Sequence, residues 1–315
     1  MSGSGSGAEV DALPAFGFAE PGPLRDTLTK YALAGPKVAT AGLRVELELD
    51  GEPIPTAGDL SALLDSAGRR IAIVETTSCR LVRLADVDDA HAIDEGEGYA
   101  NSHEFRVAHE RYWNGNLGQL RERLGDPAFR IDDDTEVAAE RFRIRRILSD
   151  APDSRVVVRP TYPADRPVVD AFLAANNADV NARHGELVDA RVHPALLAEV
   201  EGTFAGALTW IVDGDALEVH TLHAVGRFQG VGTALLAAAR RVAEVVGCRR
   251  MWVVTTNDNV DALRFYQRRG MRLARVNAGA VDLARATLKP SIPETGAHGI
   301  PIRDELVLET EVHRG

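Results

Sequence analysis

One short glycine-bearing segment constrains the fold of this chain more than any other. Residues 227–232 read R-x-x-G-x-G, follow a strand-like run from Leu217 to Leu222 and open an apolar, alanine-rich helix. Glycines at 230 and 232 let the backbone turn tightly and approach a ligand without a Cβ in the way. The first amides of a helix have no partner within the helix and lie at the positive end of its dipole. The segment therefore predicts a phosphate-binding turn between a strand and a helix.

A second pattern follows about one helix and one strand later. It reads N-x-x-A-x-x-F-Y-x-x-x-G over residues 259–270, directly after the apolar run Met251 to Thr255, which is typical of a buried strand. Together the two patterns resemble the GCN5-related N-acetyltransferase (GNAT) family over roughly residues 155–315. This resemblance implies acetyl-CoA as the cofactor, with its pyrophosphate at the turn. The cofactor-binding residues that it implies are Leu222, His223, Ala224, Arg227, Phe228, Gln229, Gly230, Val231, Gly232, Thr233, Asn259, Ala262 and Phe265.

The resemblance also implies how the chemistry is arranged. A β-bulge near Leu222 to Ala224 would hold the pantetheine arm and separate two strands, Asn259 would contact that arm, and Tyr266 would lie near the thioester sulfur as the general acid. Acetyl transfer needs a polarised carbonyl, which backbone amides can provide, and a proton for the thiolate, which a tyrosine can provide. The alternative interpretation of Tyr266 is a packed aromatic residue on an amphipathic helix.

Two residues are candidates for the general base. Glu218 and His220 lie on the strand before the turn, where alternation places both on one face, and either could take the ammonium proton of an amine. The alternative is a pair of ordinary strand residues on a solvated face. Cys248 lies at the end of the helix after the turn and is not placed as a nucleophile, which favours direct transfer over a covalent acetyl-enzyme. The expected acceptor is a small-molecule or peptide amine.

Length and composition predict a two-domain cytoplasmic protein. At 315 residues the chain exceeds the usual size of a single core, and 45% hydrophobic and 26% charged residues are ordinary for globular proteins. No apolar run is long enough to span a bilayer, and the Ser-Gly N-terminus is not a secretory signal. Cys79 and Cys248 lack the spacing of a disulfide framework or a metal site, so we expect no metal.

The expected segments are a flexible tail at 1–13, a first domain at 14–148, a polar linker at 149–154 and the GNAT-like domain at 155–315. The linker contains a proline between two regions of regular hydrophobic pattern, which is why the boundary is expected there.

Short strands separated by turn signals characterise the first domain, with strands expected at Leu43 to Leu49 and Arg70 to Thr77. The run G-x-K-x-A-T at 35–40, V-E-T-T at 74–77 and the acidic segment 91–98 resemble an ASCH domain, a relative of the PUA fold. The predicted class is therefore α+β: an N-terminal PUA-like β-barrel with helices, followed by the mixed α/β sheet of a GNAT domain.

The ASCH resemblance implies a second candidate site. ASCH domains are associated with RNA binding, and some small bacterial members hydrolyse the acetyl group of N4-acetylcytidine with a Lys, a Thr three residues later and a Glu. These roles would lie on Lys37, Thr40 and Glu95, with Glu75 competing for the role of the acid. A lysine can activate a threonine hydroxyl for attack on an amide, and a carboxylate can orient the ammonium group. The alternative is a structural Lys–Glu ion pair lining a ligand cleft.

The acidic charge is concentrated in the first domain. Residues 1–150 hold 17 Lys and Arg against 27 Asp and Glu, a balance of −10 within a total of −11. Affinity for a polyanion comes mostly from Lys and Arg contacts to phosphates, so a nucleoside-sized ligand fits this domain better than a long RNA. Four arginines cluster near the domain junction, and we expect them to form a solvated or interdomain face: Arg141, Arg143, Arg145 and Arg146.

Two segments are candidates for the walls of the acceptor site. The loop-rich segment 289–305 is expected either to close over the acceptor site or to be a plain surface loop. Residues 177–194 are expected to supply the rest of the acceptor pocket. The segment 289–305 begins with Lys289, one of three lysines among 36 basic residues; the others are Lys30 and Lys37.

Two other functions are compatible with the sequence. The first is a binding module rather than an enzyme, which binds a nucleoside or RNA and senses acyl-CoA. The second combines acetylating and deacetylating sites in one chain.

Overall fold

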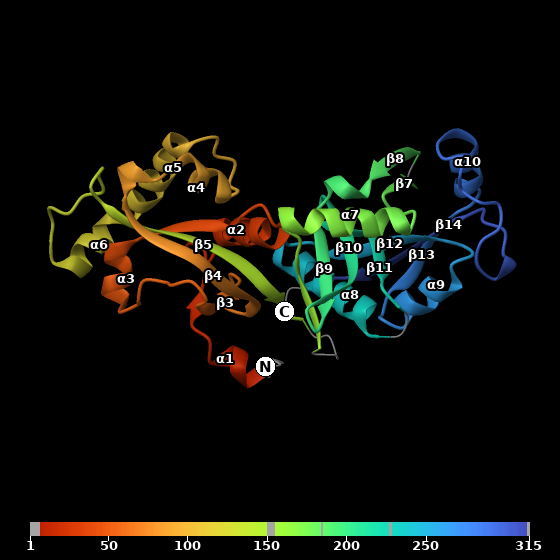
Figure 1. Cartoon of the computed structure of the whole chain (residues 1–315), viewed down its shortest axis with the longest axis horizontal. Helices are drawn as coiled ribbons and strands as arrows, with labels where there is room; N and C mark the ends of the chain where they lie inside the picture. Colours follow the sequence, from red (N-terminus) through yellow and green to blue (C-terminus); the bar gives the residue numbers. More distant parts are fainter. Residues whose placement is uncertain (1–6, 150–154, 184, 227–228, 314–315) are drawn as a thin grey trace. The chain divides into compact units, whose positions relative to one another are not determined.

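The computed structural model describes residues 7–149, 155–183, 185–226 and 229–313. The chain forms two compact units that divide after Arg146. Most of the expected linker, residues 150–154, lies outside the described residues. Figure 1 shows the helices and strands of both units.

A five-stranded sheet in the order β1-β3-β4-β5-β2 forms the framework of the N-terminal unit. Its long neighbouring strands β4 and β5 run toward a group of helices at one end (Figure 1). The predicted combination of strands with helices is confirmed, and the strands form a five-stranded sheet in which no pairing of β1 with β2 is described, where a β-barrel was expected. The strands are β1 (Ala15–Phe16), β2 (Ala39–Leu43), β3 (Leu60–Leu64), β4 (Arg70–Arg83) and β5 (Glu136–Ile147). The helices are α1 (Gly7–Asp11), α2 (Pro23–Ala34), α3 (Arg44–Asp50), α4 (Asp89–Asp94), α5 (Ser102–Gly115) and α6 (Leu117–Leu124).

The predicted strand at Leu43–Leu49 is wrong. Strand β2 ends at Leu43, and the next seven residues form helix α3. Apolar residues at every second position match a strand, but Arg, Glu and Leu are strong helix formers, and Arg44 and Glu48 form an ion pair of 2.7 Å one turn apart. Gly51, with a φ of 68°, ends the helix where a turn was expected.

The flexible tail expected at 1–13 is also shorter than predicted. Helix α1 lies within it, and the guanidinium of Arg70 donates to the carbonyl oxygens of Val10 and Leu13 at 3.2 and 2.9 Å. These hydrogen bonds join the segment to β4, because two backbone acceptors meet one planar donor. Residues 1–6 lie outside the described residues.

The C-terminal unit contains a seven-stranded sheet in the order β13-β14-β12-β11-β10-β9-β6. The pair β11 and β12 is parallel, and the other described pairs in this sheet are antiparallel. The expected mixed sheet is confirmed. The strands are β6 (Val156–Pro160), β9 (Ala195–Val200), β10 (Thr203–Asp213), β11 (Ala216–Ala224), β12 (Arg250–Thr256), β13 (Arg272–Asn277) and β14 (Glu305–Glu311), and a separate hairpin comprises β7 (Val180–Arg183) and β8 (Glu186–Asp189). The helices are α7 (Arg166–Ala175), α8 (Val231–Val245), α9 (Val260–Gln267) and α10 (Ala280–Thr287).

Helix α8 anchors the turn that precedes it. Its sequence is rich in alanine and leucine, which favour helix, and it packs along β6, β9, β10 and β11. The side chains of Leu235, Ala239 and Val242 are fully buried against the sheet. The end of the helix nearest the glycine turn is therefore held in one position.

Candidate active site

The turn before α8 has the backbone geometry that its glycines predict. Gly226 and Gly230 have φ values of 75° and 81°, a region that other residues rarely adopt. Gly230 is the N-cap of α8, so the amides that follow it lie at the helix N-terminus. A Cβ at Gly232 would lie 3.2 Å from Cε2 of Phe265, so the glycine allows α9 to pack closely against α8.

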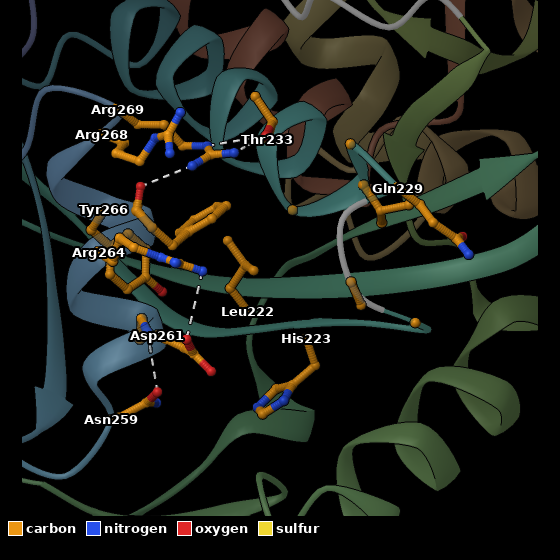
Figure 2. Close-up of a pocket in the computed structure, with 17 residues that line it drawn as sticks. Leu222, His223, Gln229, Thr233, Asn259, Asp261, Arg264, Tyr266, Arg268 and Arg269 are labelled. Carbon is orange, nitrogen blue, oxygen red and sulfur yellow. Dashed lines mark hydrogen bonds and ion pairs between the residues drawn. The ribbon is translucent and has the colours of Figure 1, made fainter. Parts of the chain in front are cut away.

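A pocket of about 790 Å³ opens beside this turn, between β11, α8 and α9 (Figure 2). Its volume is typical of sites that hold a cofactor. The predicted cofactor residues at 222–224 and 229–233 line it, as do Asn259, Ala262 and Phe265. Arg227 and Phe228, which were also predicted, lie outside the described residues.

Helix α9 and the residues that directly follow it add positive charge that the motifs did not indicate. Arg264, Arg268 and Arg269 line the pocket. Arg269 donates from Nε to Oγ1 of Thr233 at 3.0 Å, and its guanidinium carbon lies 3.7 Å from the centroid of the Phe265 ring (Figure 2). Burial and the neighbouring Arg268 lower the pKa of Arg269. Guanidinium groups beside a helix N-terminus suit a ligand that carries phosphates.

Strands β11 and β12 separate beside this pocket. Their parallel pairing ends where Val219 lies opposite Val253. Both strands continue, β11 to Ala224 and β12 to Thr256. The sheet is therefore open between them at the level of the pocket.

The irregularity expected in β11 at Leu222–Ala224 lies instead at His220. The pairing of β11 with β10 skips from Val219 to Thr221, so His220 is the additional residue. Residues 222–224 pair regularly with β10. The hydroxyls of Thr209 and Thr221 form a buried hydrogen bond of 2.8 Å, which holds the register on the far side of the shift. The bulge in β11 therefore lies two residues earlier than predicted.

A second pocket, of about 310 Å³, lies between the separated strands. Both of the segments expected to build an acceptor site, 177–194 and 289–305, contribute to its walls. The two pockets adjoin each other, because five residues line both of them: Leu222, His223, Asn259, Ala262 and Tyr266.

Tyr266 lies at the junction of the two pockets and is 6% exposed. Burial raises the pKa of its hydroxyl to about 12, although the charge of Arg183 acts in the opposite direction. The hydroxyl therefore stays protonated near neutral pH and can donate its proton. Asn259 begins the same helix, where its Oδ1 accepts a hydrogen bond from the amide of Ala262 at 3.2 Å.

The two candidate bases are buried rather than solvated. Nδ1 of His220 lies 3.6 Å from Oε1 of Glu218, in accord with their expected shared face. Arg183 in β7 pairs with Glu218 at 3.0 Å and donates to the carbonyl oxygen of His220 at 3.2 Å. His220 lines the second pocket, and its ring nitrogens have no hydrogen-bond partner among the described residues. Sequence reasoning missed Arg183, which belongs to neither motif.

The N-terminal unit buries an ionic cluster around Lys37. The lysine is 1% exposed, and its Nζ lies 2.5 Å from Oε1 of Glu97 and 3.8 Å from Oε2 of Glu95. His91 and His109 approach the Glu95 carboxylate at 3.6 and 3.4 Å. Burial alone would raise the pKa of Glu95, but His91, Lys37 and His109 outweigh it and hold that pKa below its ordinary value. Glu97, which sequence reasoning missed, is the nearer partner of the lysine.

An aromatic-lined pocket of about 230 Å³ adjoins this cluster. Thr40 and Glu97 line it together with Tyr99, His109 and Trp113. Aromatic rings can stack on a flat heterocycle, and the small volume suits one nucleoside-sized group. The structure thus brings Thr40 and the carboxylate partner of Lys37 to the same cavity.

The prediction that Glu75 competes for the role of the acid is wrong. Its carboxylate accepts a hydrogen bond of 3.0 Å from Arg143 and pairs with Arg145 at 3.2 Å. Strands β4 and β5 are neighbours in the sheet, so Glu75 meets these arginines across the strands instead of reaching Lys37. Arg141 pairs with Asp94 at 2.8 Å.

The described residues contain no group of three or more His, Cys, Asp or Glu placed to hold a metal ion. No described helix has both the length and the apolar character that a membrane span requires.

Comparison with known families matches each unit separately. The model of the ASCH domain matches residues 15–145, and the model of the acetyltransferase (GNAT) family matches residues 156–271. Two uncharacterized proteins of Bacillus subtilis are similar: YdhI is 43% identical over 106 residues, and YxbD is 42% identical over 112 residues. These matches span 34% and 36% of this chain and 66% and 70% of the relatives' own lengths.

Solved structures resemble each part of the chain. An ASCH domain from Lactobacillus crispatus is 24% identical, with a TM-score of 0.36, over 42% of this chain and 78% of that one. A GNAT family acetyltransferase from Elizabethkingia anophelis, solved with acetyl-CoA bound, is 18% identical, with a TM-score of 0.36, over 50% of this chain and 99% of that one. The chain carries an ASCH domain in its N-terminal unit and, through its C-terminal unit, belongs to the GNAT acetyltransferase family.

Proposed function

We propose that this chain is an acetyl-CoA-dependent N-acetyltransferase that transfers the acetyl group directly to a small-molecule or peptide amine. The observation that best supports this function is the meeting of two pockets at Tyr266. When bound, acetyl-CoA supplies an activated thioester. The first pocket fits it, because a left-handed glycine turn, a helix N-terminus and three arginines provide for phosphates.

The chain's own groups would orient the bound molecules. At one end of the first pocket, the amides after Gly230 and the guanidinium groups of Arg264 and Arg268 would bind the negatively charged phosphates of the cofactor. Beyond Val219, β11 no longer pairs with β12, which leaves backbone groups of β11 available to an extended ligand arm. Asn259 stands at the other end, where the pockets join.

Proton transfer would involve His220 and Tyr266. His220 lines the second pocket with unsatisfied ring nitrogens and takes the proton of the acceptor amine. Tyr266 remains protonated and supplies a proton to the departing sulfur. Glu218, held by Arg183, keeps the histidine in place. Cys248 is 2% exposed and lines neither pocket, which supports transfer without an acetyl-cysteine.

The first experiment is thermal unfolding of the intact chain with and without acetyl-CoA. Ligand at 100 times its Kd adds about 2.7 kcal/mol, which raises Tm by roughly 5–11 °C. Gly230→Glu places a side chain at positive φ and an anion at the turn, so it should abolish the shift. Gly118→Glu in α6, where an added Cβ meets nothing within 4 Å, is the matched control. The absence of a shift in the unaltered protein would refute the cofactor assignment.

The second experiment separates an enzyme from an acyl-CoA sensor. Tyr266→Phe and His220→Asn should each lower the rate of amine-dependent CoA release by about 10²- to 10⁴-fold while the acetyl-CoA shift in Tm persists. A protein that binds acetyl-CoA but releases CoA with no amine in a broad panel would instead be a sensor.

A second candidate function concerns the ASCH domain, which we propose binds a nucleoside-like ligand. The aromatic pocket beside Thr40 and Glu97 is the observation that favours it. Hydrolysis of an acetyl-amide by Thr40 with Lys37 and a carboxylate is the catalytic version of this proposal. Incubation with N4-acetylcytidine tests both versions. Binding without cleavage would support a domain that only binds the ligand. Cleavage that Lys37→Ala leaves unchanged would exclude the catalytic version.

A further inference from the structure

Lys289 occupies an unusual position in the C-terminal unit. It is the one lysine in the sequence of residues 147–315, which otherwise uses arginine where a permanent positive charge occurs. It begins the segment 289–305 and lines the second pocket. Its Nζ donates to the carbonyl oxygen of Val180 in β7 at 2.6 Å. The ammonium group therefore lies where the two segments that wall the second pocket meet.

The charges that line this pocket are not paired with one another. Among the described residues, Lys289 forms no ion pair with a carboxylate and uses one donor on the backbone. Glu305 lines the same pocket and is 8% exposed; it accepts a hydrogen bond of 3.1 Å from the Asn277 amide and forms no ion pair within the described part of the chain. Arg183, by contrast, is paired with Glu218. A separated cation and anion thus face one small cavity.

We propose that the acceptor is a small zwitterionic amine whose anionic group, a carboxylate or a phosphate, binds Lys289. This inference rests on the proposed acetyltransferase function and names the substrate class of the same site. An ammonium group has three donors, so Lys289 can keep its bond to Val180 and still bind an anion. Glu305 supplies the opposite charge for the amine and disfavours a second anionic group. A volume of about 310 Å³ suits an acceptor the size of an amino acid.

A purely structural role for Lys289 has a different signature. If the lysine only joined the segment after α10 to β7, its removal would weaken every acceptor equally. If it binds an anion, its removal weakens anionic acceptors and leaves their neutral counterparts unchanged. The ratio of kcat/KM for an acidic amine to kcat/KM for its neutral amide therefore measures the effect of the acceptor's anionic group alone.

The experiment measures CoA release by the full chain with matched acceptor pairs. Amino acids are compared with their carboxamides, and phosphoethanolamine with ethanolamine, in the unaltered protein and in Lys289→Met, Lys289→Arg and Lys30→Met. Lys30 lies on α2 of the other unit and controls for the loss of a lysine. For the anionic member of the preferred pair, we expect Lys289→Met to raise KM by about 10- to 100-fold, the usual effect of removing a hydrogen bond to a charged group. Lys289→Arg should retain most of the preference, and Lys30→Met all of it.

The outcomes separate the inference from the function on which it rests. A preference for carboxylate or for phosphate acceptors that Lys289→Met removes supports the inference and identifies the anion. Turnover of neutral amines as fast as of their acidic partners, or an equal loss for both in Lys289→Met, overturns the inference and leaves the acetyltransferase in place. Absence of both CoA release and an acetyl-CoA shift in Tm overturns the proposed function itself. Acetyl-CoA binding without turnover of any acceptor refutes the inference together with transfer.

Discussion

Replacing Lys37 with methionine tests how the buried cluster of the N-terminal unit is stabilised. Nζ of Lys37 lies 2.5 Å from Oε1 of Glu97, and the two side chains are 1% and 15% exposed. At an effective dielectric constant of about 20, charges at this separation attract by about 7 kcal/mol before the cost of removing them from water. Methionine would leave Glu97 and Glu95 without their lysine, and breaking a buried pair in this way costs about 3–5 kcal/mol. For a unit of this size, Tm should fall by roughly 10–20 °C.

Differential scanning calorimetry of the intact chain measures this loss. Lys30→Met, in α2 of the same unit, is the matched control and should change stability by no more than about 0.5 kcal/mol. Adding Glu97→Gln to Lys37→Met removes the unpaired charge and should recover part of the lost Tm. The reasoning is refuted if Lys37→Met behaves like Lys30→Met, or if the double variant is no more stable than the single one.

Three further outcomes are expected. Because burial raises the pKa of Tyr266 to about 12, kcat should not decline between about pH 8 and 10; a decline there that Tyr266→Phe removes would contradict this. The pKa of Glu95 is lowered by the fold, so its stabilisation is present above its ordinary value of 4.5 and is lost as the pH falls through the lowered value. Acid unfolding followed by circular dichroism should therefore depend on pH more steeply in the unaltered chain than in Glu95→Gln, and equal slopes would count against the assignment. Gly206→Ala would place a Cβ 2.6 Å from the carbonyl oxygen of His223 and should cost at least about 1–3 kcal/mol in urea unfolding. Gly42→Ala, with open space at its Cβ, should cost far less, and a similar loss in both would rule out the steric explanation.

Local backbone demands explain why much of the first pocket could be predicted. The left-handed turn at Gly230 and the close approach at Gly232 require glycine, so the requirement is visible in the sequence itself. The residues missed depend on contacts between distant segments. Arg183 reaches Glu218 from another strand, and Lys289 reaches Val180 across 109 positions of the chain, and no local pattern reports either contact.

The N-terminal unit shows where periodicity misleads. Alternating apolar residues predicted a strand at Leu43–Leu49, but helix propensity and an ion pair within one turn favoured α3. Spacing alone could not choose among the nearby carboxylates, because partner choice depends on sheet order. Glu75 faces the arginines of β5, whereas Glu97 folds back onto Lys37.

The position of β14 has a consequence for biosynthesis. This strand lies between β12 and β13 in the sheet, although both precede it in the chain. During translation β13 therefore has no neighbour on the sheet until residues 305–311 have left the ribosome. Helix α9, with Tyr266, lies in the sequence between those two strands and would be incompletely supported until then. The ASCH domain can fold much earlier on the ribosome, so the nascent chain would form the aromatic-lined pocket of this domain well before it could complete the sheet of the GNAT unit.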